Sequence, residues 1–384
     1  MNKEMHHFDA IIIGGGIAGL WSLTVLRNKG YDAILIEKDS LGSGQTFASQ
    51  GLIHGGIKYS LRGTKSGASE SIADMPMRWR SCLAGTDSVN LRGVKVLSHN
   101  FYMFSDSRFS SKLTAFFGSK AIEGRVSTLT ADDYPTAFES SKFNGLLYQL
   151  KDLVLDTPSL IRQLQKQFKN FIFSGDVKFV GKTNQVESVL LKSGLTLSAK
   201  TYILAAGKGN EDLISSLELK IPMQLRPLHQ VVVKGEALPD LFAHAVALKT
   251  SDKPRITITT HTNVNGKSWY LGGALAESGV TRSEEEQIKF ARKELNVVLP
   301  WIDYSRCEFS TFRVDRAEAG NKTRLRPDLP YVMRHGNIIV CWPTKLTLAP
   351  MMGDSVLELM PMPEAHKAGL INLPRASIGT PSWA

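Results

Sequence analysis

Three glycines near the amino terminus have the spacing of a phosphate-binding turn. Gly14, Gly16 and Gly19 follow an apolar run and fit the pattern G-x-G-x-x-G. The first glycine permits a tight turn, the second lets the backbone approach a pyrophosphate, and the third lets a helix pack closely on a strand. The helix that begins near Ile17 would point its free N–H groups and its positive end at the phosphates. We therefore predict that this turn, including Ile17 and Ala18, binds a dinucleotide.

A carboxylate stands at the end of the next apolar run. Residues 33–37 are predicted to form a second strand, and Glu37 lies 18 residues after Gly19. A carboxylate at this place can accept hydrogen bonds from the adenosine ribose hydroxyls, and its charge would repel a 2′-phosphate, which argues against NADP. We include Glu37 and the following Lys38 in the predicted cofactor site. The alternative is a parallel α/β unit that binds no ligand.

Residues 43–59 have the composition of a binding loop. Four glycines stand among small hydroxyl side chains and a few large residues. Glycine allows the backbone to approach a flat or charged group and to adopt unusual dihedral angles. A long surface loop is the alternative, but the interleaved Leu52, Ile53 and Ile57 favour burial. The residues of this loop that we expect to contact the cofactor are Gln45, Thr46, Ser49, Gln50, Gly51, Leu52, His54 and Gly55.

The rest of the chain supplies the elements that must hold these groups. A helix is predicted over residues 157–168, with Thr157 as its N-cap and Pro158 at its first position. Short strands at 171–173, 177–180, 186–191 and 196–197 are expected to form an inserted antiparallel meander. The further predicted elements are a helix near 66–83, strands at 94–97, 101–104, 230–233, 256–260 and 269–272, and a helix over 284–299.

Length and composition are those of an ordinary globular protein. The chain has 384 residues, 42% of them hydrophobic and 21% charged, which is enough for two domains. Cys82, Cys307 and Cys341 have neither C-x-x-C nor metal-ligand spacing, so we predict no disulfide framework and no metal site. The amino terminus leaves no room for a signal peptide, and no apolar run reaches transmembrane length. A reducing, cytoplasmic setting is the simplest expectation.

The positive net charge of the chain does not by itself identify a binding partner. The formal net charge is +10, which would favour a membrane surface, a nucleic acid or an acidic metabolite. Because lysine and arginine are spread along the chain without a polybasic block, we favour a merely solvated surface. Peripheral contact with the anionic inner face of a membrane remains an alternative, and nucleic acid is the less favoured partner.

Residues 51–59 read Gly-Leu-Ile-His-Gly-Gly-Ile-Lys-Tyr. This loop resembles the one that lies against the isoalloxazine ring in FAD-dependent oxidoreductases of the D-amino-acid oxidase superfamily, most closely the glycerol-3-phosphate and L-2-hydroxyglutarate dehydrogenases. The likeness continues at the strand 200–209, with Ala206 and Gly207 beside the cofactor, and at residues 312–353, with Leu346 and Thr347 under the flavin. It implies non-covalently bound FAD. In this interpretation the N–H groups that follow Pro350 would stabilise the reduced flavin.

The resemblance implies an α/β protein with a discontinuous domain arrangement. A Rossmann-like FAD-binding domain would comprise residues 1–85, 145–220 and 313–363. A substrate domain built on an antiparallel sheet would comprise residues 86–144 and 221–312. The tail, residues 364–384, has no pattern and is expected to be disordered.

The resemblance also transfers five positions that would contact the substrate or the flavin: Lys58, Tyr59, His229, Arg313 and Lys345. We hypothesise that His229 removes a proton while the adjacent C–H passes to the flavin as hydride. Arg313 and Lys345 would hold an anionic group, Arg313 in a bidentate way. The alternatives are a structural histidine and a solvated loop lysine at position 58.

Only one dinucleotide motif is found, so a bound substrate rather than a nicotinamide is expected to reduce the flavin. The predicted function is oxidation of a CH–OH group of a small anionic metabolite. Oxidation of CH–NH on the same scaffold is the first alternative, and a tRNA-modifying flavoprotein is the second. Trp342-Pro343 replaces the usual glycine pair before Lys345, and we expect no counterpart of the extra C-terminal domain of the glycerol-3-phosphate dehydrogenases. The substrate, and oxygen or quinone as electron acceptor, therefore stay open.

Overall fold

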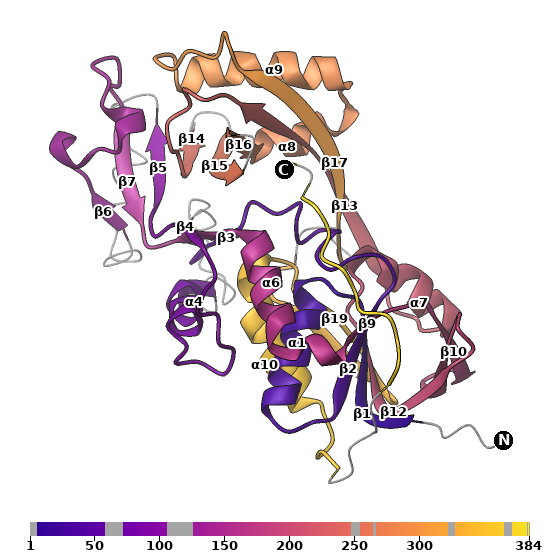
Figure 1. Ribbon diagram of the computed structural model, residues 1–384. Helices are drawn as coiled ribbons and strands as arrows, with labels where there is room; N and C mark the ends of the chain where they lie inside the picture. Colours follow the sequence, from indigo (N-terminus) through magenta and orange to yellow (C-terminus); the bar gives the residue numbers. More distant parts are fainter. Residues whose placement is uncertain are drawn as a thin grey trace.

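The computed structural model describes residues 6–57, 72–105, 126–246, 254–263, 266–321, 327–364, 371–381 and 383 (Figure 1). Within them the chain builds two large sheets and one small one. The small sheet has the order β3-β8-β4. Its strands are β3 (Leu52–Ile53), β8 (Leu153–Leu155) and β4 (Val96–Ser98).

The first large sheet is mainly parallel. β1 pairs in parallel with β2 and β12, while β9 and β19 extend the parallel part on either side. Because parallel strands end at the same edge of a sheet, the glycine turn after β1, Glu37 at the end of β2 and the segment after β19 lie close together. The strands are β1 (His6–Ile13), β2 (Ala33–Glu37), β9 (Ile172–Ser174), β10 (Val177–Lys182), β11 (Gln185–Leu191), β12 (Thr196–Leu204), β18 (Tyr331–His335) and β19 (Ile338–Trp342).

Helices cover both faces of this sheet. One face is packed by α1 (Ile17–Asn28), α6 (Thr157–Phe168) and α10 (Ala349–Glu358), whose apolar residues share one core with Ala10 and Ile12 of β1. The alternate residues, Ile11 and Ile13, face a second core that includes α7 (Asn210–Ser216). The continuous apolar run of β1 is thus explained by burial on both sides.

The second large sheet is mainly antiparallel, and α9 (Glu284–Val298) packs along one of its faces (Figure 1). A capping box between Ser283 and Glu286 fixes the start of α9. The sheet order is β17 (Glu308–Ala319), β13 (Met223–Lys234), β16 (Gly266–Gly272), β15 (Ile256–Asn263), β14 (Ala243–Val246), β5 (Phe101–Ser105), β7 (Leu146–Leu150) and β6 (Val126–Thr128).

Shorter elements connect the sheets. α4 (Met75–Ala84) corresponds to the carboxyl-terminal part of the helix predicted near 66–83, and residues 58–71 lie outside the described residues. Within the described part of the chain there is one further helix, α8 (Ala274–Ser278), and the 3₁₀ turns there are η2 (Ala131–Asp133), η3 (Thr136–Phe138), η4 (Lys169–Phe171), η5 (Gly207–Gly209), η6 (Gly279–Thr281) and η7 (Leu346–Leu348). Among the described residues no helix has both the length and the apolar content needed to cross a bilayer.

Two local predictions are corrected. The N-cap of α6 is Asp156, whose carboxylate accepts the N–H of Ser159 at 2.8 Å, so the cap lies one residue before Thr157. The predicted four-strand meander is wrong because β9 pairs in parallel with β2, and because residues 196–204 form one strand. Only β10, β11 and the start of β12 pair in the antiparallel sense. Short apolar runs do not reveal which neighbour they will meet.

Two segments within the ranges predicted for the FAD-binding domain pair with the second large sheet. β7 belongs to the second sheet although residues 145–150 were assigned to the first domain, and the same holds for residues 313–319 of β17. The tail is ordered in its described part, since Leu41 donates its N–H to the carbonyl oxygen of Ser377 at 2.8 Å. Sequence pattern missed this tail because it pairs with a loop as irregular backbone rather than as a helix or strand.

Candidate active site

A cavity of about 1630 Å³ is lined by residues from both large sheets. It runs past the glycine turn and Glu37 to residues 48–54, and its other walls come from β13, β17 and residues 341–346. Pockets for a single small ligand commonly measure about 300–1,000 Å³, so this space is large enough for a dinucleotide and a small substrate together.

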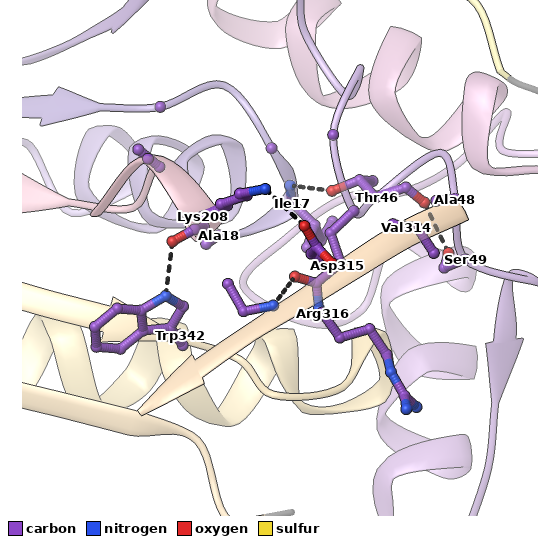
Figure 2. Close-up of a pocket in the computed structure, with 18 of the residues that line it drawn as sticks. Ile17, Ala18, Thr46, Ala48, Ser49, Lys208, Val314, Asp315, Arg316 and Trp342 are labelled. Atoms are coloured by element: carbon purple, nitrogen blue, oxygen red, sulfur yellow. Dashed lines mark hydrogen bonds and ion pairs between the residues drawn. The ribbon is translucent and has the colours of Figure 1, made fainter. Parts of the chain in front are cut away.

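The glycine turn has the geometry that the sequence predicts. Gly14 has φ +109°, and a Cβ there would lie 2.6 Å from the Cα atom of Ala206. A Cβ on Gly19 would lie 1.9 Å from the carbonyl oxygen of Gly14. Only glycine fits at these two positions. Ile17 donates its N–H to the hydroxyl of Thr46 at 3.0 Å, and the first turn of α1 has no acidic residue (Figure 2). This helix end is therefore suited to an anion.

Glu37 is held at the adenosine end of the cavity. Its carboxylate accepts the N–H of Gly15 at 2.5 Å and the N–H of Asp39 at 2.8 Å. These bonds fix the side chain beside the turn, where a ribose would be bound. The predicted cofactor residues that line the cavity are Gly14, Gly16, Ile17, Ala18, Glu37, Lys38, Gln45, Thr46, Ser49, Gln50, Leu52, His54, Ala206, Gly207 and Leu346.

Four predicted cofactor residues do not line the cavity: Gly19, Gly51, Gly55 and Thr347. Thr347 instead supports the loop, because its hydroxyl accepts the N–H of His54 at 2.8 Å. Gly55 donates its N–H to Asp152 at 2.8 Å. Gly51 has φ +68°, and a Cβ there would meet the carbonyl oxygen of Leu155 at 2.1 Å. These residues hold the loop that carries His54 rather than touching the cavity themselves.

Gln45 and Gln50 have a second role that the sequence did not indicate. The amide oxygen of Gln45 accepts the N–H of Ala317 at 3.0 Å. The amide nitrogen of Gln50 donates to the carbonyl oxygens of Tyr270 at 2.8 Å and Thr257 at 3.1 Å. Both side chains therefore tie the cofactor loop to the second sheet. The Tyr270 hydroxyl, which also bonds to the carbonyl oxygen of Ala48, has its pKa raised well above the usual value by burial.

The register of β13 and β17 decides which predicted catalytic residues reach the cavity. His229 lies directly opposite Arg313, and Arg226 lies opposite Arg316. Opposed residues of an antiparallel pair share a face, and residues three apart on one strand lie on opposite faces. The two pairs therefore point to different sides of the sheet.

His229 is on the side away from the cavity, and its predicted role as a base is corrected. Its ring nitrogens bond to the carbonyl oxygen of Gly279 at 3.0 Å and to the hydroxyl of Thr311 at 2.9 Å. Its own carbonyl oxygen accepts the side-chain amide of Gln287 in α9 at 2.8 Å. It does not line the cavity, and only 2% of its surface is exposed. This is the structural alternative considered for a histidine on a strand.

Arg313 shares that face. Its guanidinium donates to the carbonyl oxygens of Val280 and Arg282, each at 2.6 Å, although part of the residue borders the cavity. The two guanidinium nitrogens that were predicted to bind an anion therefore donate to two backbone carbonyl oxygens. Lys58 and Tyr59, the other predicted positions beside the loop, lie outside the described residues.

Arg226 and Arg316 occupy the cavity side of the same strands, and sequence reasoning missed both. Arg226 contacts the buried carboxylate of Glu318 at 2.5 Å. Arg316 contacts Glu277 of α8 at 3.5 Å, and both of these side chains line the cavity. The predicted strand begins at residue 230, whereas β13 begins at Met223, so Arg226 lies outside the predicted strand.

Lys345 is the last of the five positions that the family resemblance assigns to the substrate or the flavin. It lines the cavity, and its ammonium group donates to the carbonyl oxygen of Asp328 at 3.2 Å, with the carboxylate of Asp328 at 4.0 Å. It follows β19 and precedes η7, so the parallel sheet brings it to the same edge as the glycine turn. Across the cavity Lys208 points at Asp315, at 2.6 Å (Figure 2). This carboxylate raises the pKa of Lys208.

The fold and this cavity define a flavin-dependent oxidoreductase: the chain belongs to the family of FAD dependent oxidoreductases (DAO), whose model matches residues 9–359. It is similar to the probable FAD-dependent oxidoreductase PA4991 of Pseudomonas aeruginosa, with 44% identity over 381 residues, which are 98% of this chain and 97% of that protein. The crystal structure of PA4991 superposes with a TM-score of 0.86 at 39% identity, covering 99% of this chain and 98% of the other.

Two more distant structures share the fold. Glycine oxidase from Geobacillus kaustophilus has a TM-score of 0.68 at 16% identity, covering 96% of this chain and 99% of the other. The L-alpha-glycerophosphate oxidase from Mycoplasma pneumoniae, solved with FAD bound, has a TM-score of 0.67 at 15% identity, covering 96% and 100%. The cofactor of this enzyme is FAD, and the cavity fits it: the helix end of α1 suits the pyrophosphate, and Glu37 suits the ribose.

Proposed function

We propose that this flavoenzyme oxidises the CH–NH group of a small amino or imino acid. The observation that supports this best is the Arg316–Glu277 pair on the cavity wall. An arginine and a carboxylate 3.5 Å apart can receive the carboxylate and the ammonium group of one zwitterion. The two side chains are 17% and 31% exposed, and Arg316 also donates from Nε to the carbonyl oxygen of Arg226 at 3.3 Å. Both side chains line the cavity, so a ligand bound there would contact them.

The side chains supply binding, orientation and proton acceptance. When bound, FAD accepts a hydride from the substrate carbon. Arg316 would hold the substrate carboxylate, and Lys345 adds a second positive charge to the same cavity. One ammonium proton must leave before the hydride does, and the Glu277 carboxylate is placed to accept it. The substrate ammonium loses one proton to Glu277 and its carbon loses one hydride, so the product is the protonated imine (iminium).

A second candidate, oxidation of CH–OH, has one observation in its favour. An alcohol needs a base for its hydroxyl proton, and His229 does not reach the cavity. His54 does line it, held through its backbone by Thr347. An imidazole at this position could accept a hydroxyl proton. Of the two more distant structures, one is a glycine oxidase and the other an L-alpha-glycerophosphate oxidase, so the shared fold favours neither CH–NH nor CH–OH oxidation.

The test is anaerobic reduction of the bound flavin. Purified holoenzyme would be mixed with a panel of amino and imino acids, 2-hydroxy acids and glycerol phosphates, and bleaching of the visible flavin band followed. The proposal expects bleaching by at least one amino or imino acid. Bleaching by hydroxy compounds alone would transfer the assignment to CH–OH oxidation with His54 as the base. Readmitting air, and then a quinone, would identify the electron acceptor.

A further inference from the structure

The carboxyl-terminal residues 371–381 and 383, here called the strap, lie along the loop that lines the cofactor cavity. Residues 40–50 form that loop, here called the flavin loop. Leu41 donates its N–H to the carbonyl oxygen of Ser377 at 2.8 Å, and Gly379 donates its N–H to the carbonyl oxygen of Leu41 at 3.0 Å. In Figure 1 the yellow strap ends near the second sheet. The described strap residues therefore bond to the flavin loop without lining the cavity themselves.

The start of the strap is anchored on the first sheet. Ser174 donates its N–H to the carbonyl oxygen of Pro374 at 2.7 Å, and Gln165 of α6 donates to that of Ala376 at 3.1 Å. The guanidinium of Arg375 lies 4.6 Å from the centre of the Phe173 ring and donates to the carbonyl oxygen of Asn170 at 2.6 Å. These contacts hold residues 374–376 of the strap against the first large sheet and α6.

The end of the strap is anchored by Trp383, which is 3% exposed. Its indole N–H donates to the carbonyl oxygen of Phe47 in the flavin loop at 3.2 Å. Its ring lies 4.4 Å from that of His261 on the second sheet, at an interplanar angle of 34°. Trp383 also packs with Tyr270, whose ring is 5.4 Å from that of the cavity-lining Phe312. One side chain thus contacts the flavin loop and the layer directly behind the substrate wall.

We propose that Trp383 is a positioning residue for the cofactor site, and that the strap sets the distance between the flavin loop and the substrate wall. Residues 45–50 of the flavin loop already bond to the second sheet through the side chains of Gln45 and Gln50 and the carbonyl oxygen of Ala48. Trp383 adds a fourth connection, a hydrogen bond to the carbonyl oxygen of Phe47, in the middle of residues 45–50. Without it the loop keeps its ends but loses its central support. The proposal rests on FAD binding and not on the identity of the substrate.

The test compares four proteins: wild type, Trp383→Ala, Trp383→Phe and the matched control Trp301→Phe. Trp301 also donates its indole N–H to a carbonyl oxygen, that of Ala137 at 2.7 Å, and its ring lies 5.4 Å from that of Phe143 at an interplanar angle of 59°, but it does not line the cavity. The readouts are the dissociation constant of FAD from fluorescence titration of apoprotein, the visible spectrum of bound flavin, and its reduction potential by dye equilibration.

We expect Trp383→Ala to weaken FAD binding about tenfold, because one hydrogen bond and one ring contact are lost. Trp383→Phe keeps the ring and loses only the donor, so we expect about a threefold effect. Both should shift the spectrum and the potential, and the control should match wild type. Trp383→Ala with wild-type affinity, spectrum and potential would overturn the proposal. An equal loss in the control would do the same, since it would show a general effect of removing an indole.

If Trp383→Ala does not fold, the measurements on Trp383→Phe test the proposal. Near-ultraviolet circular dichroism establishes which variants are folded. A folded Trp383→Phe protein whose FAD dissociation constant and flavin spectrum equal those of wild type would contradict the proposed role of the indole N–H. None of these measurements uses a substrate, so their failure is distinct from failure of the amino acid assignment.

Discussion

The two faces of the β13–β17 strand pair carry charged residues with different environments. On the cavity face, Arg226 and Arg316 stand opposite one another and each contacts a carboxylate. On the other face, His229 and Arg313 stand opposite one another and bond mainly to backbone carbonyl oxygens under α9 and η6. The residue types are similar, but both residues of the first pair line the cavity, whereas of the second pair only Arg313 borders it. The difference teaches that strand phase, rather than residue type, decides which of these charged side chains face the cavity.

The first prediction concerns His261 of β15, a buried histidine of the second sheet that must stay uncharged. Burial, with Lys95 adding repulsion, lowers the pKa of His261 from 6.5 to about 3. Below pH 6.5 the unfolded chain binds a proton that the folded chain does not, so stability falls as the pH drops toward 3. Because the pKa of His261 is lower in the folded than in the unfolded chain, this histidine destabilises the fold at acid pH.

Urea unfolding at pH 6.5 and pH 5 would check this. Wild type should lose about 2 kcal/mol more than His261→Asn over that interval, because only the wild type carries the depressed imidazole. The carboxylates are common to both proteins and cancel in the comparison. Equal losses in the two proteins would show that His261 titrates normally.

The next effect separates the two arginines directly. Arg316→Met should lower kcat/KM for the best amino acid substrate by about 30-fold to 5,000-fold, or about 2–5 kcal/mol, since a charge-assisted carboxylate contact is removed. Arg313→Met should stay within about threefold of wild type, because its partners are backbone carbonyl oxygens. Stopped-flow flavin reduction measures both. A larger loss in Arg313→Met would reverse the assignment of the faces.

His229, on the sheet face away from the cavity, is predicted to contribute to stability and not to the rate of flavin reduction. His229→Leu loses bonds to Gly279 and Thr311, so the free energy of unfolding should fall by about 1–3 kcal/mol. The rate of flavin reduction in the folded fraction should remain that of wild type. If His229 were the base, the rate would instead fall by about 10²–10⁴. Chemical denaturation together with rapid-mixing kinetics distinguishes the two outcomes.

The smallest effect concerns the exposed Lys208–Asp315 pair at the cavity. Asp315 raises the pKa of Lys208, so the stabilisation is complete below the ordinary lysine pKa and is lost only as the pH rises through the raised value. Asp315→Asn should therefore leave Tm nearly unchanged between pH 6 and 9. The expected difference, seen by calorimetry, is a Tm that falls less steeply in the variant above about pH 10. A large loss at pH 7 would contradict the view that this surface pair contributes little.

Local patterns predicted the cofactor half of the molecule well. The glycine spacing, Glu37 and the loop that carries His54 are contiguous signals, and each reflects a short-range requirement such as φ +109° at Gly14. Helix α1 and strand β2 follow from the same run. The family resemblance added Lys345, whose position at the sheet edge depends on a strand more than 300 residues away from the glycine turn.

The substrate half was predicted poorly because its geometry depends on register between distant strands. A shift of one residue reverses the face of every side chain, and β13 pairs with β17 across about 90 residues of sequence. The motif around His229 therefore pointed to the correct strand and the wrong face. The strap was missed for a related reason, since its order comes from contacts with residues 41, 47 and 174 rather than from a pattern of its own.

The most direct measurement of the central claim is the binding of an unreactive carboxylate, such as propionate, followed as a perturbation of the visible flavin spectrum. The readout needs no turnover and does not depend on which substrate is oxidised. Wild type and Arg313→Met should show the same saturable perturbation, and Arg316→Met should show it only at concentrations at least about 30-fold higher. Normal binding by Arg316→Met, with loss in Arg313→Met, would contradict the claim that Arg316 on the cavity face receives the carboxylate.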